Sequence, residues 1–390
     1  MTAPQLPPQV PELVIDNAAE LYALEVAAGI AAASGVAGAV AELWGWAARL
    51  WVLRFRGVDK PATDERSWGE YMTDLETRIR TIRVDVGGPL RRWARDALAL
   101  GARQAVTEIL DDGGLPDDVH DQRTGGVRAI DDDPLLRWIA DAQATARRPG
   151  SGRTPGVRGP DLTTVVASAL PDGLPDDVET VLGGVDATAR GKLRAAADAA
   201  SRASGTEFTH VVRDVLAVAQ QAVTTAETTT AWSIHRAANA GIQAVAERLR
   251  VERLWISERD ACPDCLSLSG RVSVGGVFEL PKAFGADPAP VWPAPPLRCP
   301  PRHPRCRCRT RLWFGSRTTS DLPALLQREA EKAILLGWRR AGDSESRRLA
   351  AAEWLLDHGT TATKTDQDRA RRAIKNRAFP STPRRTGTTK

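Results

Sequence analysis

All five cysteines of the chain fall in one segment, between positions 262 and 308, and a histidine lies among them. Two residues separate Cys262 from Cys265, a spacing that lets two thiolates turn towards one metal ion. Zinc is held by four sulfur or nitrogen donors, so the pattern predicts a structural zinc site with more donors than one ion needs. The candidate ligands are Cys262, Cys265, His303, Cys306 and Cys308, with Cys299 as a substitute ligand.

The cysteine spacing is also compatible with disulfides, with a redox pair and with free thiols. Disulfides would suit an exported protein, but the number of cysteines is odd and the N-terminus lacks the basic and apolar regions of a secretory signal. A redox pair of the thioredoxin type would need a strand that leads into a helix, and that context is missing. The thiols could also be reduced and simply packed near one another. A metal, however, would cross-link a Pro-rich segment that has little other means of holding its shape.

The elements that must position these donors are short strands. Residues 253–257 (Arg-Leu-Trp-Ile-Ser) and 309–314 (Arg-Thr-Arg-Leu-Trp-Phe) look like strands. Residues 272–280 contain a Gly-Gly step between two apolar stretches, which predicts a hairpin. We therefore expect a small α+β Cys/His-rich module near residues 250–315.

The rest of the chain is dominated by helical periodicity. Apolar residues recur at helical spacing over residues 13–110, with breaks at Pro61 and near Gly87, and again over residues 186–250. We expect a mainly α protein of long helices and helical bundle segments. The expected regions are an N-terminal helical region 1–110, a Gly/Pro/Asp-rich linker with one short helix 111–162, a helical region 163–250, the Cys/His module 251–315 with a preceding helix from about 220, C-terminal helices 316–360, and a disordered basic tail 361–390.

Composition and hydropathy narrow the class of protein. Hydrophobic residues make up 42%, charged residues 26% and the net charge is +4, which excludes collagen-like, wholly disordered and disulfide-miniprotein classes. The best candidate for a membrane segment is the uncharged run Val26–Ala41, which is shorter than the ~18–20 residues of a span. Its Ala and Gly content favours a close-packed helix pair, so we expect no stable membrane span; an interfacial or pore-lining segment is the alternative.

A wider pattern surrounds the candidate ligands. In chain order it comprises a helix with Glu227, Ala231 and Asn239, then Trp255, Cys262-Pro-Asp-Cys265, Gly270, a hairpin, and a closing His303-Pro-Arg-Cys306-Arg-Cys308. This pattern resembles the phage Mu F-like head morphogenesis, or minor capsid, family over roughly residues 220–312. Thr225-Ala226 stand where that family often has Arg-Thr, and Cys299 is additional to its pattern.

The resemblance implies a minor head protein of a tailed phage or prophage. Such a protein lies in the virion, in the capsid interior or at the portal vertex, and in the host cytoplasm during assembly. Its expected partners are the portal protein and capsid or scaffold subunits, with packaged double-stranded DNA as a further partner. The resemblance implies no catalytic residues. The alternative is a zinc-stabilised nucleic-acid-binding protein that is not part of a virion.

Basic residues gather around the second group of ligands and near the C-terminus. Arginine suits phosphate because its planar guanidinium donates two hydrogen bonds at once. The arginines near the cysteines could equally compensate an anionic zinc–thiolate centre or face solvent, and the basic tail could simply be solvated. The candidates for DNA contact are Arg298, Arg302, Arg305, Arg307, Arg309, Arg311, Arg371, Arg372 and Lys375.

The chain lacks the sequence motifs of common catalytic classes. We find no HExxH, no GxSxG and no Walker-type phosphate loop. Nucleotide deaminases need Pro-Cys-x-x-Cys with His-x-Glu upstream, but Ala261 precedes Cys262 and Arg236 follows His235. We therefore predict a protein that is not an enzyme and has no small-molecule substrate.

Overall fold

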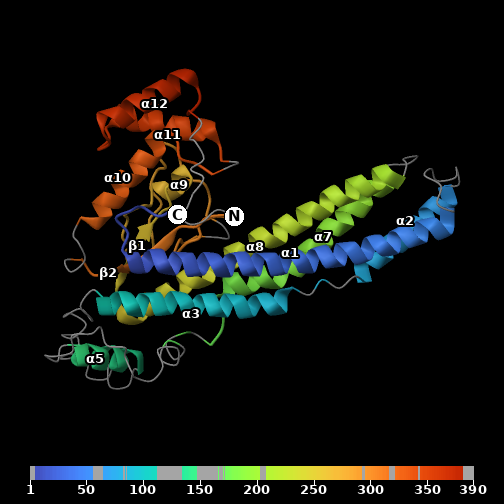
Figure 1. Ribbon diagram of the computed structural model, residues 1–390, viewed down its shortest axis with the longest axis horizontal. Helices are drawn as coiled ribbons and strands as arrows, with labels where there is room; N and C mark the ends of the chain where they lie inside the picture. The colour runs from blue at the N-terminus through green and yellow to red at the C-terminus, as the bar shows by residue number, and fades with distance from the viewer. Residues whose placement is uncertain are drawn as a thin grey trace, which may run out of the picture. The chain divides into compact units, whose positions relative to one another are not determined.

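The computed structural model has a mainly helical fold (Figure 1), as the sequence predicts. Its described elements are α1 (Glu12–Phe55), α2 (Glu65–Thr81), α3 (Gly87–Asp111), α5 (Pro134–Ala146), α7 (Asp176–Arg202), α8 (Phe208–Leu249), β1 (Glu252–Ile256), α9 (Pro263–Leu266), β2 (Arg309–Trp313), α10 (Leu322–Leu335), α11 (Glu345–His358) and α12 (Lys364–Asn376). The structure describes every residue outside 1–4, 56–64, 82–83, 85, 112–133, 147–165, 167–169, 171, 203–207, 292–294, 316–320, 341–342 and 381–390. Most of the linker expected over 111–162 therefore lies outside the described residues.

The chain divides into two compact units, and each is built from separate stretches of sequence. Unit 1 consists of Met1–Tyr22, Ala97–Asp172 and Ala238–Lys390, and unit 2 consists of Ala23–Asp96 and Gly173–Ala237. The long helices α1, α3 and α8 contribute residues to both units. The regions expected from the sequence, in contrast, are consecutive along the chain.

Unit 2 contains an aromatic cluster between α1 and α2. The ring of Trp51 lies 5.4 Å from that of Tyr71 and 6.0 Å from that of Trp68, both in edge-on contact. The hydroxyl of Tyr71 donates to the carbonyl of Ala47 at 3.3 Å, which satisfies the polar end of a side chain that is only 1% exposed. These rings bury large apolar areas and fix the packing of the two helices.

Within unit 1, α3 and α8 meet with their backbones in contact. A Cβ added at Gly101 would lie 1.8 Å from the carbonyl oxygen of Ala238, and one added at Gly241 would lie 2.0 Å from that of Leu98. Glycine is the only residue that fits at such a distance. The paired glycines therefore set how closely these two helices approach each other.

The sheet of unit 1 is the small antiparallel pair β1–β2, in which Ile256 is opposite Arg309 and Glu252 is opposite Trp313. Both predicted strands are thus confirmed. The predicted hairpin is present as a tight turn, because Val274 bridges Val277 and both intervening glycines have positive φ, at 57° and 75°. Positive φ at both central residues is the geometry that a Gly-Gly hairpin turn requires.

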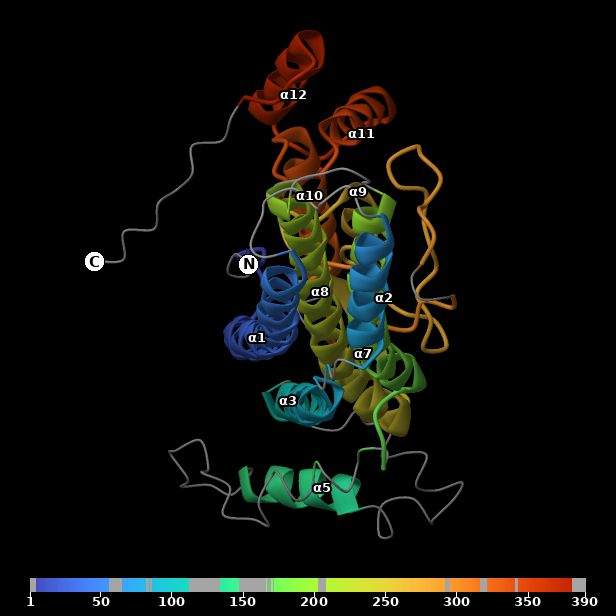
Figure 2. The ribbon, with the colours of Figure 1, turned by 90° about the vertical axis from the view of Figure 1, so that its right-hand side faces the viewer.

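Helices α10, α11 and α12 pack beside the Cys/His module and beside one another (Figure 2). The sequence-based expectation of a disordered tail over 361–390 is wrong for the first part of that range, because residues 364–376 form α12. Ala370, Ala373 and Asp366 recur at helical spacing and are buried, so this polar segment has a narrow packing face. Residues 381–390 lie outside the described part of the chain.

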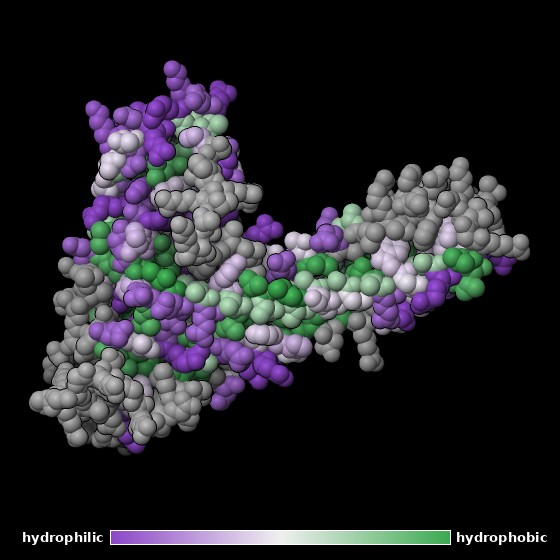
Figure 3. All heavy atoms as spheres, in the orientation of Figure 1, coloured by the Kyte–Doolittle hydropathy of each residue, from purple (hydrophilic) through white to green (hydrophobic). Residues whose placement is uncertain are grey.

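Helix α1 extends well beyond the uncharged run identified in the sequence. Its 44 residues make it the one helix in the described parts of the chain that could cross a membrane by length and composition. Of its most apolar stretch, 39% is buried, while Ile30 and Leu53 are 61% and 78% exposed. Hydrophobic and neutral residues follow α1 on the face drawn in Figure 3. The absence of a stable membrane span stays a prediction.

Candidate metal centre

The pairing of β1 with β2 brings the two groups of candidate ligands together. Because Ile256 is opposite Arg309, the chain that leaves β1 starts beside the chain that enters β2. The sulfur of Cys308 accordingly lies 3.7 Å from the hydroxyl oxygen of Ser257. The same hydroxyl donates to the carbonyl of Cys265 at 2.5 Å. We call the segment with Cys262 and Cys265 the first ligand loop, and the segment from His303 to Cys308 the second ligand loop. Ser257 therefore links the first ligand loop to the last cysteine of the second.

The first pair of cysteines is held by the short helix α9. Cys262 is its N-cap residue, and Pro263 occupies the first turn, where its missing N–H costs nothing. The amide of Leu266 donates to the carbonyl of Cys262 at 2.9 Å, which closes the turn and leaves both sulfurs on the same side. This is how the two-residue spacing presents two thiolates to one point.

The second group is held by a tight turn. The amide of Cys306 donates to the carbonyl of His303 at 3.0 Å, and Arg305 in this turn has φ of 65°, a left-handed conformation that is uncommon for a residue other than glycine. Nδ1 of His303 lies 2.7 Å from the carbonyl oxygen of Pro304, to which it donates as N–H. This bond leaves Nε2 as the metal-binding atom of the ring.

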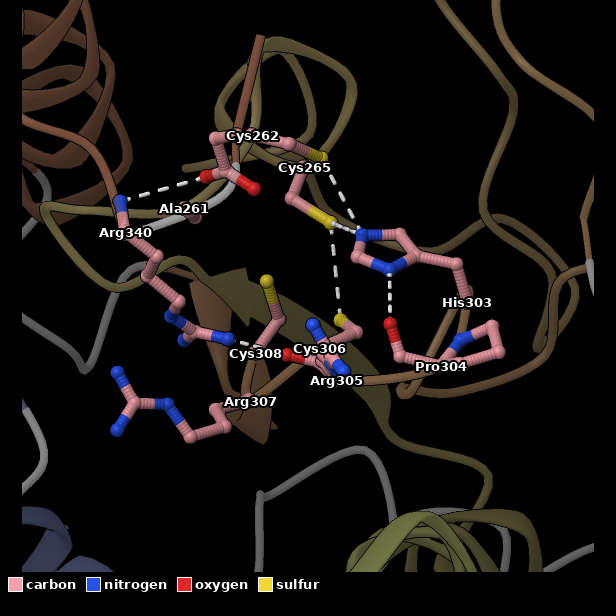
Figure 4. Close-up of a pocket in the computed structure, with 11 residues that line it drawn as sticks. Ala261, Cys262, Cys265, His303, Pro304, Arg305, Cys306, Arg307, Cys308 and Arg340 are labelled. Atoms are coloured by element: carbon pink, nitrogen blue, oxygen red, sulfur yellow. Dashed lines mark hydrogen bonds between the residues drawn. The ribbon is translucent and has the colours of Figure 1, made fainter. Parts of the chain in front are cut away.

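The donors of both groups converge on one cavity of about 140 Å³ (Figure 4). Nε2 of His303 lies 3.2 Å from the sulfur of Cys262 and 3.2 Å from that of Cys265. The sulfur of Cys265 lies 3.6 Å from that of Cys306. In a zinc tetrahedron two sulfurs are about 3.8 Å apart and a sulfur and a nitrogen about 3.5 Å, given metal–ligand lengths of ~2.3 and ~2.0 Å. The donors are thus close to metal-binding separations.

The candidate ligands form two triads that share Cys265. One triad is Cys262, Cys265 and His303, and the other is Cys265, Cys306 and Cys308; within each, all donor atoms lie within 4.8 Å of one another. Either group could hold a metal ion. Because the five donors outnumber the four of a tetrahedral site, one of them is a spare.

Cys299 is the candidate that the described structure assigns to neither triad. Its side chain is buried, but among the described residues it belongs to neither triad and does not line the cavity. A zinc ligand has to reach within about 2.3 Å of the ion. That Cys299 is a substitute ligand therefore stays a prediction.

The cavity favours a charged thiolate. A hydrogen bond with Cys265 lowers the pKa of Cys262 to about 5, while the pKa of Cys265 is raised well above its ordinary value by the same contact. Burial lowers the pKa of His303, but its contact with Cys262 and the charge of Cys306 outweigh burial and raise that pKa to about 10. The metal-free chain therefore keeps a thiolate beside a protonated imidazole, and a metal ion would replace that proton.

Two of the arginines near the cysteines are buried in ion pairs that hold the ligand loops. Arg302 is fully buried and lies 3.5 Å from Asp264, the residue before Cys265. Arg307 pairs with Glu258 and with Asp260, the latter at 3.3 Å. Each pair joins the first ligand loop to the second. Neither arginine faces solvent, so neither is available to DNA in this structure, contrary to the sequence-based expectation.

The remaining candidates for DNA contact divide by exposure. Arg309 and Arg311 are 4% and 3% exposed, and Arg309 donates to the carbonyl of Ala18 at 3.2 Å, so these two are also wrong as surface contacts. The other candidates are exposed, namely Arg298, Arg305, Arg371, Arg372 and Lys375.

Sequence reasoning missed the carboxylates that organise the site. Asp264 accepts from the amide of Ala289 at 2.9 Å and pairs with Arg347 of α11 at 2.7 Å. Glu258 pairs with Arg340 at 3.0 Å. The position of Asp264 inside the Cys-x-x-Cys pair was the one local signal, because Arg347 and Arg340 come from a distant part of the chain.

Comparison of the chain with known protein families, with curated proteins and with solved structures found no match. The resemblance to the Mu F-like family thus stands on the motif residues alone. The structure shows a Cys/His cluster that could hold a metal ion, in a small module that is continuous with long helices.

Proposed function

We propose that this chain is a structural minor capsid, or head morphogenesis, protein of a tailed phage or prophage, whose Cys/His module is clamped by zinc. The observation that carries the proposal is that the Cys-x-x-Cys pair and the closing His-Pro-x-Cys-x-Cys segment, which together resemble the family's motif, lie next to each other in space. Cys262 and His303 are 41 residues apart in sequence and 3.2 Å apart in space. A pattern that serves one shared metal would need this convergence.

Zinc is the metal that suits these donors. Thiolates and one imidazole in tetrahedral reach favour zinc over calcium or magnesium, which prefer oxygen. Three or more protein donors surround the cavity and a fourth is at hand, so the ion would be enclosed rather than left with an open position for substrate. A closed site of this kind stabilises structure instead of performing catalysis.

The proposed role places the protein at the portal vertex or in the capsid interior, with the portal protein and capsid or scaffold subunits as partners. Long helices supply extended surfaces for such contacts, and the zinc-clamped module would keep its shape during assembly and packaging. Packaged double-stranded DNA is the further partner.

Localisation in purified particles tests this proposal. Particles that carry an epitope-tagged copy should show the tag at the portal vertex by labelling and electron microscopy, and the protein should co-purify with filled heads. A tagged protein found only outside particles, in a host that produces complete virions, contradicts the virion role.

The exposed cations of α12 favour a second candidate, a zinc-stabilised nucleic-acid-binding protein outside any virion. Arg372 and Lys375 lie on the solvent side of the helix, opposite buried Ala370 and Ala373. Binding through such cations would weaken steeply with salt. Replacing Arg372 and Lys375 by Gln should then weaken duplex DNA binding and reduce its salt dependence, whereas unchanged binding removes α12 from the interface.

A further inference from the structure

Arg348 of α11 is a buried cation with incomplete pairing beside the candidate metal centre. Its side chain is 1% exposed, and Nη2 donates to the carbonyl of Ala261 at 2.6 Å. Among the described residues, Nη1 has no hydrogen-bond partner and no carboxylate forms an ion pair with Arg348. Ala261 directly precedes the ligand Cys262, so the guanidinium is fixed against the ligand loop.

The carboxylates near the cavity are already engaged with other arginines. Asp264 pairs with Arg302 and Arg347. The carboxylates of Glu258 and Asp260 each pair with the guanidinium groups of Arg307 and Arg340. Asp343 also lines the cavity and accepts from the backbone amide of Arg340. Three carboxylates therefore share four guanidinium groups before Arg348 is counted, and Arg348 adds a further positive charge beside them.

We propose that Arg348 is the counter-charge of an anionic metal–thiolate centre and positions it through the carbonyl of Ala261. A zinc ion held by three thiolates and one neutral imidazole carries one net negative charge, and one held by four thiolates carries two. A buried charge is costly unless it is paired, and the thiolates are the groups that remain to pair with Arg348. This inference rests on the proposed zinc site and adds a residue that lies outside the ligand set.

If Arg348 is a counter-charge, its removal should affect metal affinity and the stability of the metal-free chain differently. Residues that contact the ligands of a metal commonly change its affinity by about 10–100-fold when they are removed. Loss of the Arg348 charge should therefore weaken metal binding, yet it should not destabilise the metal-free chain in proportion, because it also removes a buried charge that has no carboxylate partner there. A residue that served only to hold the loop would instead weaken both states together.

The experiment uses the full-length chain with Zn²⁺ and a chromophoric chelator as competitor. Arg348→Gln removes the charge but keeps an N–H donor for the carbonyl of Ala261, while Arg348→Lys keeps the charge. Arg347→Gln is the matched control, because it removes the same charge one residue earlier, from a pair with Asp264 that is partly exposed to solvent. Melting temperatures of the metal-free variants are measured alongside.

We expect Arg348→Gln to bind Zn²⁺ about 10–100-fold more weakly, with a metal-free melting temperature close to that of the wild type. Arg348→Lys should stay within a few fold of wild-type affinity, and Arg347→Gln should change affinity less than Arg348→Gln. Equal affinity in Arg348→Gln and wild type overturns the counter-charge, as does an equal loss in Arg348→Lys and Arg348→Gln. A wild-type chain that binds no Zn²⁺ overturns the proposed zinc site as well.

Discussion

Asp264 shows how single residues prepare the ligand loops before any metal is present. It is 2% exposed, stands between Cys262 and Cys265, and receives contacts from Arg302, Arg347 and the amide of Ala289. Buried ion pairs contribute little net stability, since desolvation offsets most of their attraction. Their value here is geometric, because they tie Cys265 to segments that begin far away in the sequence.

A comparison of two buried cysteines tests the ligand assignment at this scale. Cys265→Ser should abolish stoichiometric Zn²⁺ binding, because Cys265 is shared by both triads. Cys299→Ser should keep bound Zn²⁺, although both cysteines are 1% exposed. The metal-linked stability lost in Cys265→Ser should be about 4 kcal/mol when free Zn²⁺ is ~1,000 times its Kd. Elemental analysis and thermal melts measure both quantities, and metal retained by Cys265→Ser contradicts the assignment.

Gly270 supports the same loop through its backbone. Its φ is +77°, and an added Cβ would lie 2.2 Å from the carbonyl oxygen of Pro323 at the start of α10. Gly275 also has positive φ, at +57°, but an added Cβ there meets open space. Gly275 is therefore required only by its backbone conformation, whereas Gly270 is required both by its conformation and by its close contact with α10.

Alanine substitutions at these two glycines should differ in cost. Gly275→Ala should destabilise the chain by about 1–2 kcal/mol, the penalty for a left-handed conformation alone. Gly270→Ala should cost about 1–3 kcal/mol more, because α10 must also move. Denaturant unfolding gives both values. Equal losses of unfolding free energy in the two variants would show that α10 can move away from residue 270 without a measurable penalty.

At the scale of elements, side chains from the helices cover the outer edge of β2. The amide of Thr310 donates to Oδ1 of Asn239 at 3.0 Å, and the amide of Leu312 donates to Oε2 of Glu108 at 2.8 Å. An exposed edge strand would invite pairing with another chain. Helices α8 and α3 thus take the place of a further strand, and they explain why a two-stranded sheet is sufficient here.

Tyr71 of α2 gives a pH-dependent prediction for unit 2. Burial raises the pKa of Tyr71 from 10.0 to about 12. The unfolded chain therefore loses this proton first, so the stabilising effect of neutral Tyr71 is complete below pH 10 and is lost as pH rises towards 12. The loss amounts to about 2–3 kcal/mol by linkage.

The variant Tyr71→Phe isolates this effect. Near pH ~8 it should be less stable than wild type by about 0.5–1.5 kcal/mol, because the hydrogen bond to the carbonyl of Ala47 is lost. Between pH 10 and 12 the gap should close and then reverse. Denaturant midpoints over that range measure the trend, and parallel pH profiles for the two chains would rule out titration of Tyr71.

At the scale of the whole molecule, the metal candidates belong to unit 1 alone. The described residues of unit 2 supply neither triad, and its buried side chains include apolar and aromatic residues and the paired Glu25 and His235. The effect of a metal ion on stability should therefore be confined largely to one unit.

Hydrogen exchange tests this division. A strong chelator should speed amide exchange in β2 and in α9 by more than about tenfold relative to Zn²⁺-loaded protein, because the metal links the two loops that flank these elements. Exchange in α2 should change little. Cys265→Ser serves as the control, since its exchange should no longer respond to the chelator. Equal acceleration in α2 and β2 would mean that the metal stabilises both units together.

Local features were predictable from the sequence because neighbouring residues decide them. The spacing of Cys262 and Cys265 predicts two thiolates on one turn, and the Gly-Gly step predicts the tight turn observed. Polarity misled the interpretation of α12, because three small or buried positions at helical spacing are enough to pack an otherwise charged helix.

The sequence by itself determined the mainly helical class, the two strands and the residues with metal-binding chemistry, since periodicity and side-chain type express these directly. Only the tertiary structure decided which donors meet, and that Arg302 and Arg307 pair with carboxylates instead of facing solvent. Those outcomes depend on the register of β1 with β2 and on the packing of α11 against the ligand loop. Both are contacts between segments far apart in the chain, and no local pattern encodes them.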